Sequence, residues 1–220
     1  ADVVHSSVDR FFGSANKNIG DAFLLVWKFS NNINANQETL IELKKEGTKY
    51  ITCQTMADMA VLSYLKILIR INRDPRILKY NDLPEIKEKL PNYKINMGFG
   101  LHLGWAIEGA IGSNYKIDPS YLSPNVNMAS RLEAATRQYG VSILISGQVY
   151  NFLSEDMKSI CRLIDVVLVK GSKQPIKLYA IDVNLDLQPS NNSQDIKLRE
   201  RLKIYTQKKN QIIREDRKST

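Results

Sequence analysis

The segment from Pro124 to Gly140 most constrains what this chain can fold into, because both of its ends carry helix boundary signals. Proline is favoured at the first position of a helix, and glycine directly after the last one. The segment therefore predicts a helix over 124–139. Asn127 and Arg131 are four residues apart in it, so they share one face near the N-terminus, where free N–H groups favour anions. An amide beside a permanently charged guanidinium is suited to orienting a sugar and stabilising charge on a phosphate.

A glycine-rich apolar run precedes this helix, and it predicts one long strand over 93–111. Glycines inside a strand usually mark a bulge or the close approach of another backbone. Gly98 and Gly100 resemble the start of a dinucleotide-binding loop, but the third glycine comes one residue late, at Gly104, and no helix follows directly. That fingerprint is therefore rejected.

The rest of the chain alternates between helical and extended patterns. The stretch 55–71 is apolar on nearly every face, which predicts a helix buried in the core or against a second subunit. The polar stretch 30–52 predicts an inserted surface loop. Strands joined by hairpins and mixed with helices indicate an α+β sheet with helices packed on one side. The other expected helices end near residue 12 or cover 82–90 and 147–153, and the other strands cover 14–17, 22–29, 141–145, 163–169 and 176–183.

Four blocks of sequence together resemble the class III nucleotidyl cyclases, which make cyclic AMP or cyclic GMP. The blocks are Lys17 to Asp21, Gly100-x-His102-x-Gly104-x-x-x-x-Gly109-x-x-Gly112, Val126 to Glu133, and Val169 to Gly171. They occur in the same order as in the family, and the amino-acid sequence of 122–127 resembles that of cyclase domains of large ciliate and other protist proteins. The resemblance implies a ferredoxin-like cyclase domain over 1–183 that lacks its first strand, followed by a linker and basic helical tail over 184–220.

The resemblance assigns the chemistry to a few residues. Asn127 would orient the ribose, Arg131 would stabilise the pentavalent phosphate, and Lys170 would contact the triphosphate. The alternative for Asn127 and Arg131 is helix capping and a surface ion pair with Glu133 or Glu108. The alternative for Lys170 is a solvated lysine in a turn.

Lys17 and Ser120 match the positions with which the family reads the base. Adenine offers an acceptor at N1 and a donor at N6, which an ammonium and a hydroxyl complement. Guanine presents the opposite pattern and would call for a carboxylate in place of Lys17. Ser120 departs from the more frequent Asp or Thr of the family. ATP is therefore the expected substrate, and a guanylyl cyclase is an alternative.

Asp21 matches one of the two metal-binding aspartates of the family, which implies two Mg²⁺ or Mn²⁺ ions bridged by paired carboxylates. The alternative is that Asp21 is an ordinary aspartate in a turn. The second carboxylate belongs to a strand before the helix that ends near residue 12, and it is expected upstream of Ala1. Without it the domain would be a catalytically silent module for nucleotide sensing or for a large assembly such as a ciliary one.

In the family the site forms between two catalytic domains, so a second cyclase domain is the expected partner, as a homodimer or pseudo-dimer. The net charge of +8 does not indicate nucleic acid, because half of the excess lies in 184–220, where nine lysines or arginines face five acidic residues and one aromatic, Tyr205. That tail is expected to pack on the domain or on a larger assembly.

No apolar stretch reaches the roughly 20 residues that a membrane span needs, so any span belongs to a parent protein. Cys53 and Cys161 have no metal-site spacing, which favours reduced thiols in the cytoplasm. His102 is expected to satisfy a hydrogen bond in the core rather than to bind a metal.

Overall fold

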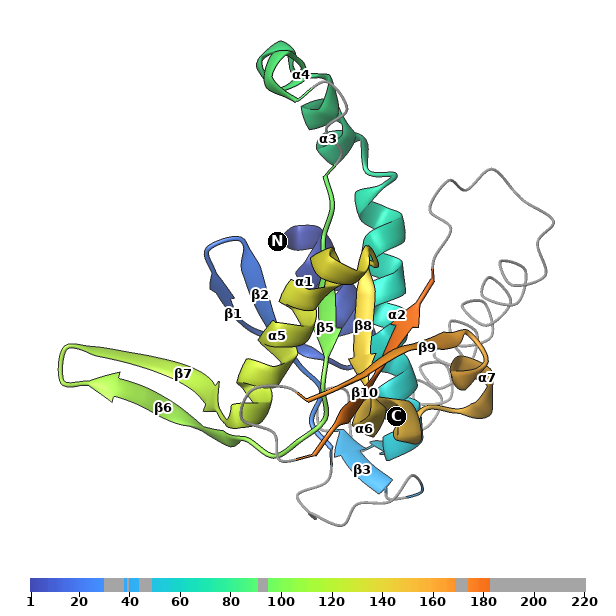
Figure 1. Cartoon of the computed structure of the whole chain (residues 1–220). Coiled ribbons are helices and arrows are strands. Elements are labelled where there is room, and N and C mark those ends of the chain that lie inside the picture. The colour runs from blue at the N-terminus through green and yellow to red at the C-terminus, as the bar shows by residue number, and fades with distance from the viewer. Residues whose placement is uncertain (30–37, 39, 44–48, 91–94, 169–173, 183–220) are drawn as a thin grey trace, which may run out of the picture. The chain divides into compact units, whose positions relative to one another are not determined.

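The computed structural model describes residues 1–29, 38, 40–43, 49–90, 95–168 and 174–182 (Figure 1). Lys170 and the tail helix expected within 184–220 lie outside these residues. The helices are α1 Asp2–Arg10, α2 Cys53–Ile71, α3 Pro75–Leu78, the 3-10 helix η1 Lys79–Asp82, α4 Pro84–Lys89, α5 Pro124–Tyr139, α6 Gly147–Phe152 and α7 Glu155–Lys158. The strands are β1 Ser14–Ile19, β2 Ala22–Val26, β3 Leu40–Leu43, β4 Lys49–Thr52, β5 Phe99–Leu101, β6 Ile107–Ser113, β7 Lys116–Leu122, β8 Ile143–Ser146, β9 Cys161–Val167 and β10 Ile176–Ile181.

A four-stranded mixed sheet forms the centre, in the order β5-β8-β10-β9 (Figure 1). β5 runs parallel to β8, and the other pairs are antiparallel. Leu144 of β8 stands opposite Gly100 on one side and Ala180 on the other. β1 with β2, β3 with β4, and β6 with β7 form separate two-stranded hairpins.

Helix α5 covers one face of this sheet. Its Leu132 is 2% exposed and packs with the inward side chains of β8 and β10, namely Leu144, Ile176, Leu178 and Ala180. β5 presents glycine to the same helix: a Cβ on Gly100 would collide with the carbonyl oxygen of Ala129 and the amide nitrogen of Glu133. The helix therefore lies directly against the strand backbone, which only glycine permits.

Helix α2 covers the opposite face. Phe99 precedes Gly100 in β5, and neighbouring residues of a strand point to opposite faces. The ring of Phe99 packs on Tyr64 of α2, with ring centroids 4.6 Å apart. Leu62 and Leu65 of α2 have no exposed surface, and burial of such a side chain contributes about 2 kcal/mol. The expected buried helix is confirmed, and so is the α+β class, with helices on both faces of the sheet rather than on one.

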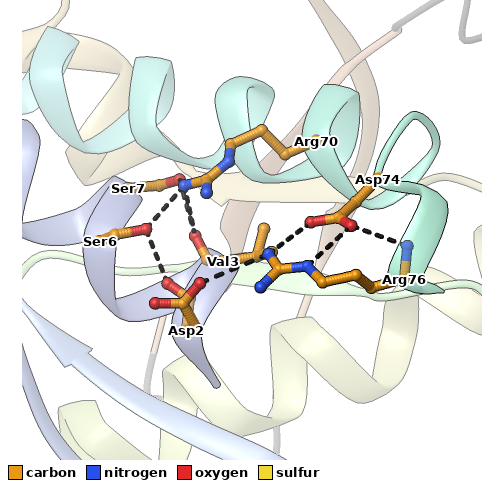
Figure 2. A network of polar contacts seen from close by, with 7 residues as sticks. All are labelled: Asp2, Val3, Ser6, Ser7, Arg70, Asp74 and Arg76. Carbon is orange, nitrogen blue, oxygen red and sulfur yellow. Dashed lines mark hydrogen bonds and ion pairs between the residues drawn. The ribbon is translucent and has the colours of Figure 1, made fainter.

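A polar network ties α1 and α3 to the end of α2 (Figure 2). Arg70 donates to three oxygen atoms of α1: the carbonyl oxygen of Val3 at 3.2 Å, Oγ of Ser6 at 2.7 Å and Oγ of Ser7 at 3.0 Å. Asp74, which caps α3, accepts from the side chain of Arg76 at 2.7 Å. These hydrogen bonds from Arg76 lower the pKa of Asp74 to about 2, so the cap stays charged at any ordinary pH.

Two sequence predictions need correction. The single strand expected over 93–111 is two strands, β5 and β6, separated by residues 102–106. β5 ends where the chain turns toward the start of α5, and β6 then pairs with β7 instead of β8. The loop expected over 30–52 contains the β3–β4 hairpin, in which Ile41 pairs with Ile51. The elements α3, η1, α7 and β7 have no counterpart in the sequence predictions.

Candidate active site

The β1–β2 hairpin carries Lys17 and Asp21. The turn at its tip places Gly20 at a φ of +62°, a conformation that glycine adopts without strain. Asp21 follows this turn and is exposed, whereas Lys17 is half-buried and pairs with Leu24 of β2. The pairing register shifts between Ala15 and Lys17, as in a β-bulge.

Asn16, the residue at this shift, connects the hairpin to β7. Its Nδ2 donates to the carbonyl oxygen of Pro119 at 3.4 Å, and its buried Oδ1 has no hydrogen-bond partner. Ser120, the next residue of β7, is 6% exposed. Lys17 follows Asn16 in the sequence, and Ser120 follows Pro119. Although they are 103 residues apart, Lys17 and Ser120 therefore lie beside the same contact between neighbouring strands.

The N-terminus of α5 carries Asn127 and Arg131. Ser123 caps the helix and accepts from the amide of Asn125 at 2.9 Å, and Gly140 ends the helix at a φ of +64° as the sequence predicts. Asn127 and Arg131 are exposed one turn apart, on the side away from the buried Leu132. This helix therefore carries an amide and a guanidinium four residues apart on its exposed surface.

Each of the two carboxylates that the sequence offers as partners of Arg131 forms an ion pair with a lysine or another arginine. Glu133 lies 3.6 Å from Arg137, and Glu108 lies 2.6 Å from Lys28. The hydrogen bond from Lys28 lowers the pKa of Glu108 and raises that of Lys28. Because Lys28 follows β2 and Glu108 belongs to β6, this pair connects the β6–β7 hairpin to the β1–β2 hairpin.

The residues present do not build a metal centre by themselves. Within the ranges that the structure describes, no group of three or more His, Cys, Asp or Glu side chains is arranged to hold an ion. Asp21 is a single exposed carboxylate, and a two-metal site needs paired ones. Burial raises the pKa of Cys161 to about 12, which keeps that thiol protonated.

His102 and Asn125 were not among the predicted site residues. His102 lies just beyond β5 and makes hydrogen bonds to Ser146 and Asn125, so the expectation of a satisfied histidine is confirmed. No local pattern indicates these contacts, because the partners are 44 and 23 residues away in the sequence.

The family described as "Adenylate and Guanylate cyclase catalytic domain" matches residues 5–183. This match covers most of the chain, and the chain belongs to that family. Among the helices that the structure describes, none combines the length and the apolar character needed to cross a bilayer.

Several adenylate cyclases are similar to this chain in sequence. It is 38% identical to the adenylate cyclase of Anabaena cylindrica over 107 residues, which are 47% of this chain and 21% of that protein. It is 30% identical to the terminal-differentiation specific adenylate cyclase of Dictyostelium discoideum over 88 residues, 40% of this chain and 4% of that protein. The chain thus matches only a small part of the length of these curated relatives.

Solved cyclase structures share the fold. A bacterial light-regulated adenylyl cyclase has a TM-score of 0.55 at 20% identity, covering 90% of this chain and 46% of the other. The guanylyl cyclase Cya2 has a TM-score of 0.54 at 18% identity, covering 87% and 79%. The adenylyl cyclase CyaB from P. aeruginosa has a TM-score of 0.53 at 20% identity, covering 84% of each chain. At these identities the likeness shows the class III cyclase fold alone.

Proposed function

We propose that this domain is an adenylyl cyclase that converts ATP to cyclic AMP and pyrophosphate. The observation that carries the proposal is the contact between Asn16 and Pro119, which sets Lys17 and Ser120 on neighbouring strands. An ammonium that donates to N1 and a hydroxyl that accepts from the N6 amino group together recognise adenine. The sequence similarity to adenylate cyclases of Anabaena cylindrica and Dictyostelium discoideum supports the same substrate.

The reaction joins the ribose 3′-oxygen to the α-phosphorus and breaks the bond from that phosphorus to the bridging oxygen of pyrophosphate. The proton of the 3′-hydroxyl is released. Asn127 holds the ribose so that the hydroxyl faces the phosphorus, and Arg131 stabilises the negative charge that grows on the phosphoryl oxygens. Lys170 contacts the triphosphate in this proposal.

The metal ions of the proposal, Mg²⁺ or Mn²⁺, would neutralise phosphate charge and favour the deprotonated hydroxyl. Asp21 supplies one ligand at an exposed hairpin tip. A second carboxylate has to come from outside the described residues, because these contain no group of ligands arranged for an ion.

Two strand edges and a cavity in the described domain support the proposal that an additional strand supplies that carboxylate. In the part of the chain that the structure describes, β2 pairs only with β1, and β5 only with β8. Residues of β2 and the segment after β5 line one mostly apolar cavity of about 140 Å³, which includes Leu25, Trp27 and Leu103. We infer that a strand from outside the described residues pairs with both edges and completes the cyclase domain.

A second cyclase domain is the proposed partner. The β6–β7 hairpin exposes large apolar side chains on both strands and in the turn between them: Ile107, Ile111, Tyr115, Ile117 and Leu122. A two-stranded hairpin with such a surface is marginally stable alone and gains from packing against another protein. A second copy fits this surface best, because a symmetric pair would then contain two equivalent sites. The proposal places the domain in the cytoplasm, where ATP is available.

One assay distinguishes this proposal from its alternatives. A purified form of the protein that includes the residues preceding Ala1 is incubated with ATP or GTP and Mn²⁺, and both cyclic products are measured. Cyclic AMP as the main product supports the proposal, whereas cyclic GMP overturns the assignment of Lys17 and Ser120. Absence of both products favours the catalytically silent module, a component of a larger assembly such as a ciliary one, held through its tail. The lack of a ligand group for a metal among the described residues supports this alternative.

A further inference from the structure

His102 lies between the central sheet and the helix that carries the proposed catalytic residues. Its Nδ1 is 2.9 Å from Oγ of Ser146, the last residue of β8, which has no exposed surface. Its Nε2 is 3.2 Å from Oδ1 of Asn125, in the first turn of α5. The imidazole thus connects the end of a buried strand to the start of α5.

Asn125 extends the connection to the segment between β5 and β6. Its Nδ2 donates to the carbonyl oxygen of Trp105 at 2.9 Å, and the Oγ of Ser123 donates to the same oxygen at 2.6 Å. Gly104 leaves room for this arrangement, since a Cβ at that position would collide with the side chain of Asn125. The break between β5 and β6 therefore supplies the groups that hold the first turn of α5.

The hydrogen bonds define the role of one ring nitrogen. Because the Nδ2 of Asn125 donates to Trp105, its Oδ1 is the acceptor, and Nε2–H of His102 donates to it. Burial lowers the pKa of His102 and thereby favours the neutral imidazole, in which Nδ1 accepts from the hydroxyl of Ser146.

The held turn begins the helix that carries the proposed catalytic groups. Asn127 ends the first turn of α5 and Arg131 lies one turn further along, so a displacement of the start of this helix shifts both side chains. A misplacement of about 1 Å at a reacting centre can lower a rate about 100-fold.

We propose that His102 is a positioning residue which, through Asn125, holds the first turn of α5 so that Asn127 and Arg131 face the ribose and the α-phosphate. This inference rests on the proposed cyclase function. His102 itself touches neither the nucleotide nor the reacting atoms in this proposal.

The test compares His102→Leu, Asn125→Ala and the conservative His102→Gln, which keeps a donor for Asn125. His102→Leu and Asn125→Ala are expected to lower kcat about 10- to 100-fold while KM for ATP changes less than about twofold. His102→Gln is expected to recover most of kcat. The double variant should lose no more than the more impaired single variant, because both substitutions break one connection.

Tyr139→Phe is the matched control, since it removes a hydrogen bond of 2.7 Å to Asp165 at the other end of α5. Its thermal stability is expected to fall about as much as that of His102→Leu, with kcat unchanged. Equal losses of kcat in His102→Leu and Tyr139→Phe would mean that His102 has only a general structural role.

Hydrogen exchange gives a second readout that needs no turnover. The amides of Asn125, Val126 and Asn127 are expected to exchange at least tenfold faster in folded His102→Leu than in the unchanged protein, and at an unchanged rate in Tyr139→Phe. Unchanged exchange at these amides overturns the inference even if the enzyme is active. Faster exchange in a protein without cyclase activity supports the positioning of the turn by His102 and rejects the proposed function instead.

Discussion

Lys17 and Ser120 are the two residues to which the proposal assigns the choice of nucleotide. Lys17 is half-buried in β1, and Ser120 is almost fully buried in β7, so neither is an ordinary solvated side chain. Asn16 adds a buried acceptor without a partner beside them. Such an unpaired acceptor is costly, and a ligand that donates a hydrogen bond at this position would remove the cost.

Lys17→Glu is expected to reverse the nucleotide preference. A carboxylate repels the acceptor at N1 of adenine and accepts from N1–H and the amino group of guanine, so cyclic AMP formation should fall tenfold or more while the GTP to ATP activity ratio rises. Rates with both nucleotides at equal Mn²⁺ measure this ratio. Lys177→Glu, the same charge change at an exposed position of β10, should leave the ratio unchanged.

Arg131→Ala is expected to lower kcat about 100- to 1,000-fold with KM for ATP within about twofold, because the guanidinium acts on charge that develops in the transition state. Steady-state kinetics with ATP check this result. The control is Arg137→Ala, which removes an exposed guanidinium six residues further along α5. A rise in KM as large as the fall in kcat would contradict the assigned role.

At the scale of elements, the position of α5 depends on glycines within β5 and on either side of it. Gly98, Gly100 and Gly104 each face α5 so closely that a Cβ would collide with Thr136, the helix backbone or Asn125, respectively. Helix packing therefore explains these three glycines. Gly109, in β6, has no atom within 4 Å of such a Cβ and does not share this role.

Gly100→Ala is expected to destabilise the fold by about 1 to 3 kcal/mol, because the added methyl group displaces α5 from the strand. Gly109→Ala is expected to change stability by less than about 0.5 kcal/mol. Thermal or urea unfolding of both variants measures the difference. Similar losses in the two variants would show that α5 does not depend on the close approach at Gly100.

For the whole molecule, the proposal divides the site between two domains. The resemblance to the family assigns Asp21 to one domain and assigns Lys17, Ser120, Asn127, Arg131 and Lys170 to the other. Each homodimer of a variant then lacks a group in both of its sites, whereas a mixed dimer keeps one complete site.

Mixing Asp21→Ala with Arg131→Ala is expected to restore activity that neither variant has alone. Random pairing makes about half of the dimers mixed, and each has one intact site of two, so recovery should reach about a quarter of the original activity. Cyclic AMP formation after mixing and dilution measures it. Failure to recover, with both variants folded and dimeric, would contradict a site shared between subunits.

The sequence by itself determined the elements whose signals are local. Pro124 and Gly140 define the bounds of α5 because capping depends on a few neighbouring residues. The apolar pattern of 55–71 predicts α2 because a buried helix needs apolar side chains on every face. The cyclase blocks, likewise contiguous in sequence, identify the family before any coordinates.

Only the tertiary structure decided where the strand over 93–111 breaks and why. The residues after β5 bind α5, and the partners of His102 are brought to it by the parallel pairing of β5 with β8 and by the packing of α5 on Gly100. The contact between Asn16 and Pro119 likewise joins strands more than 100 residues apart. Such contacts depend on how closely backbones approach in the folded chain, and no pattern of neighbouring residues encodes that distance.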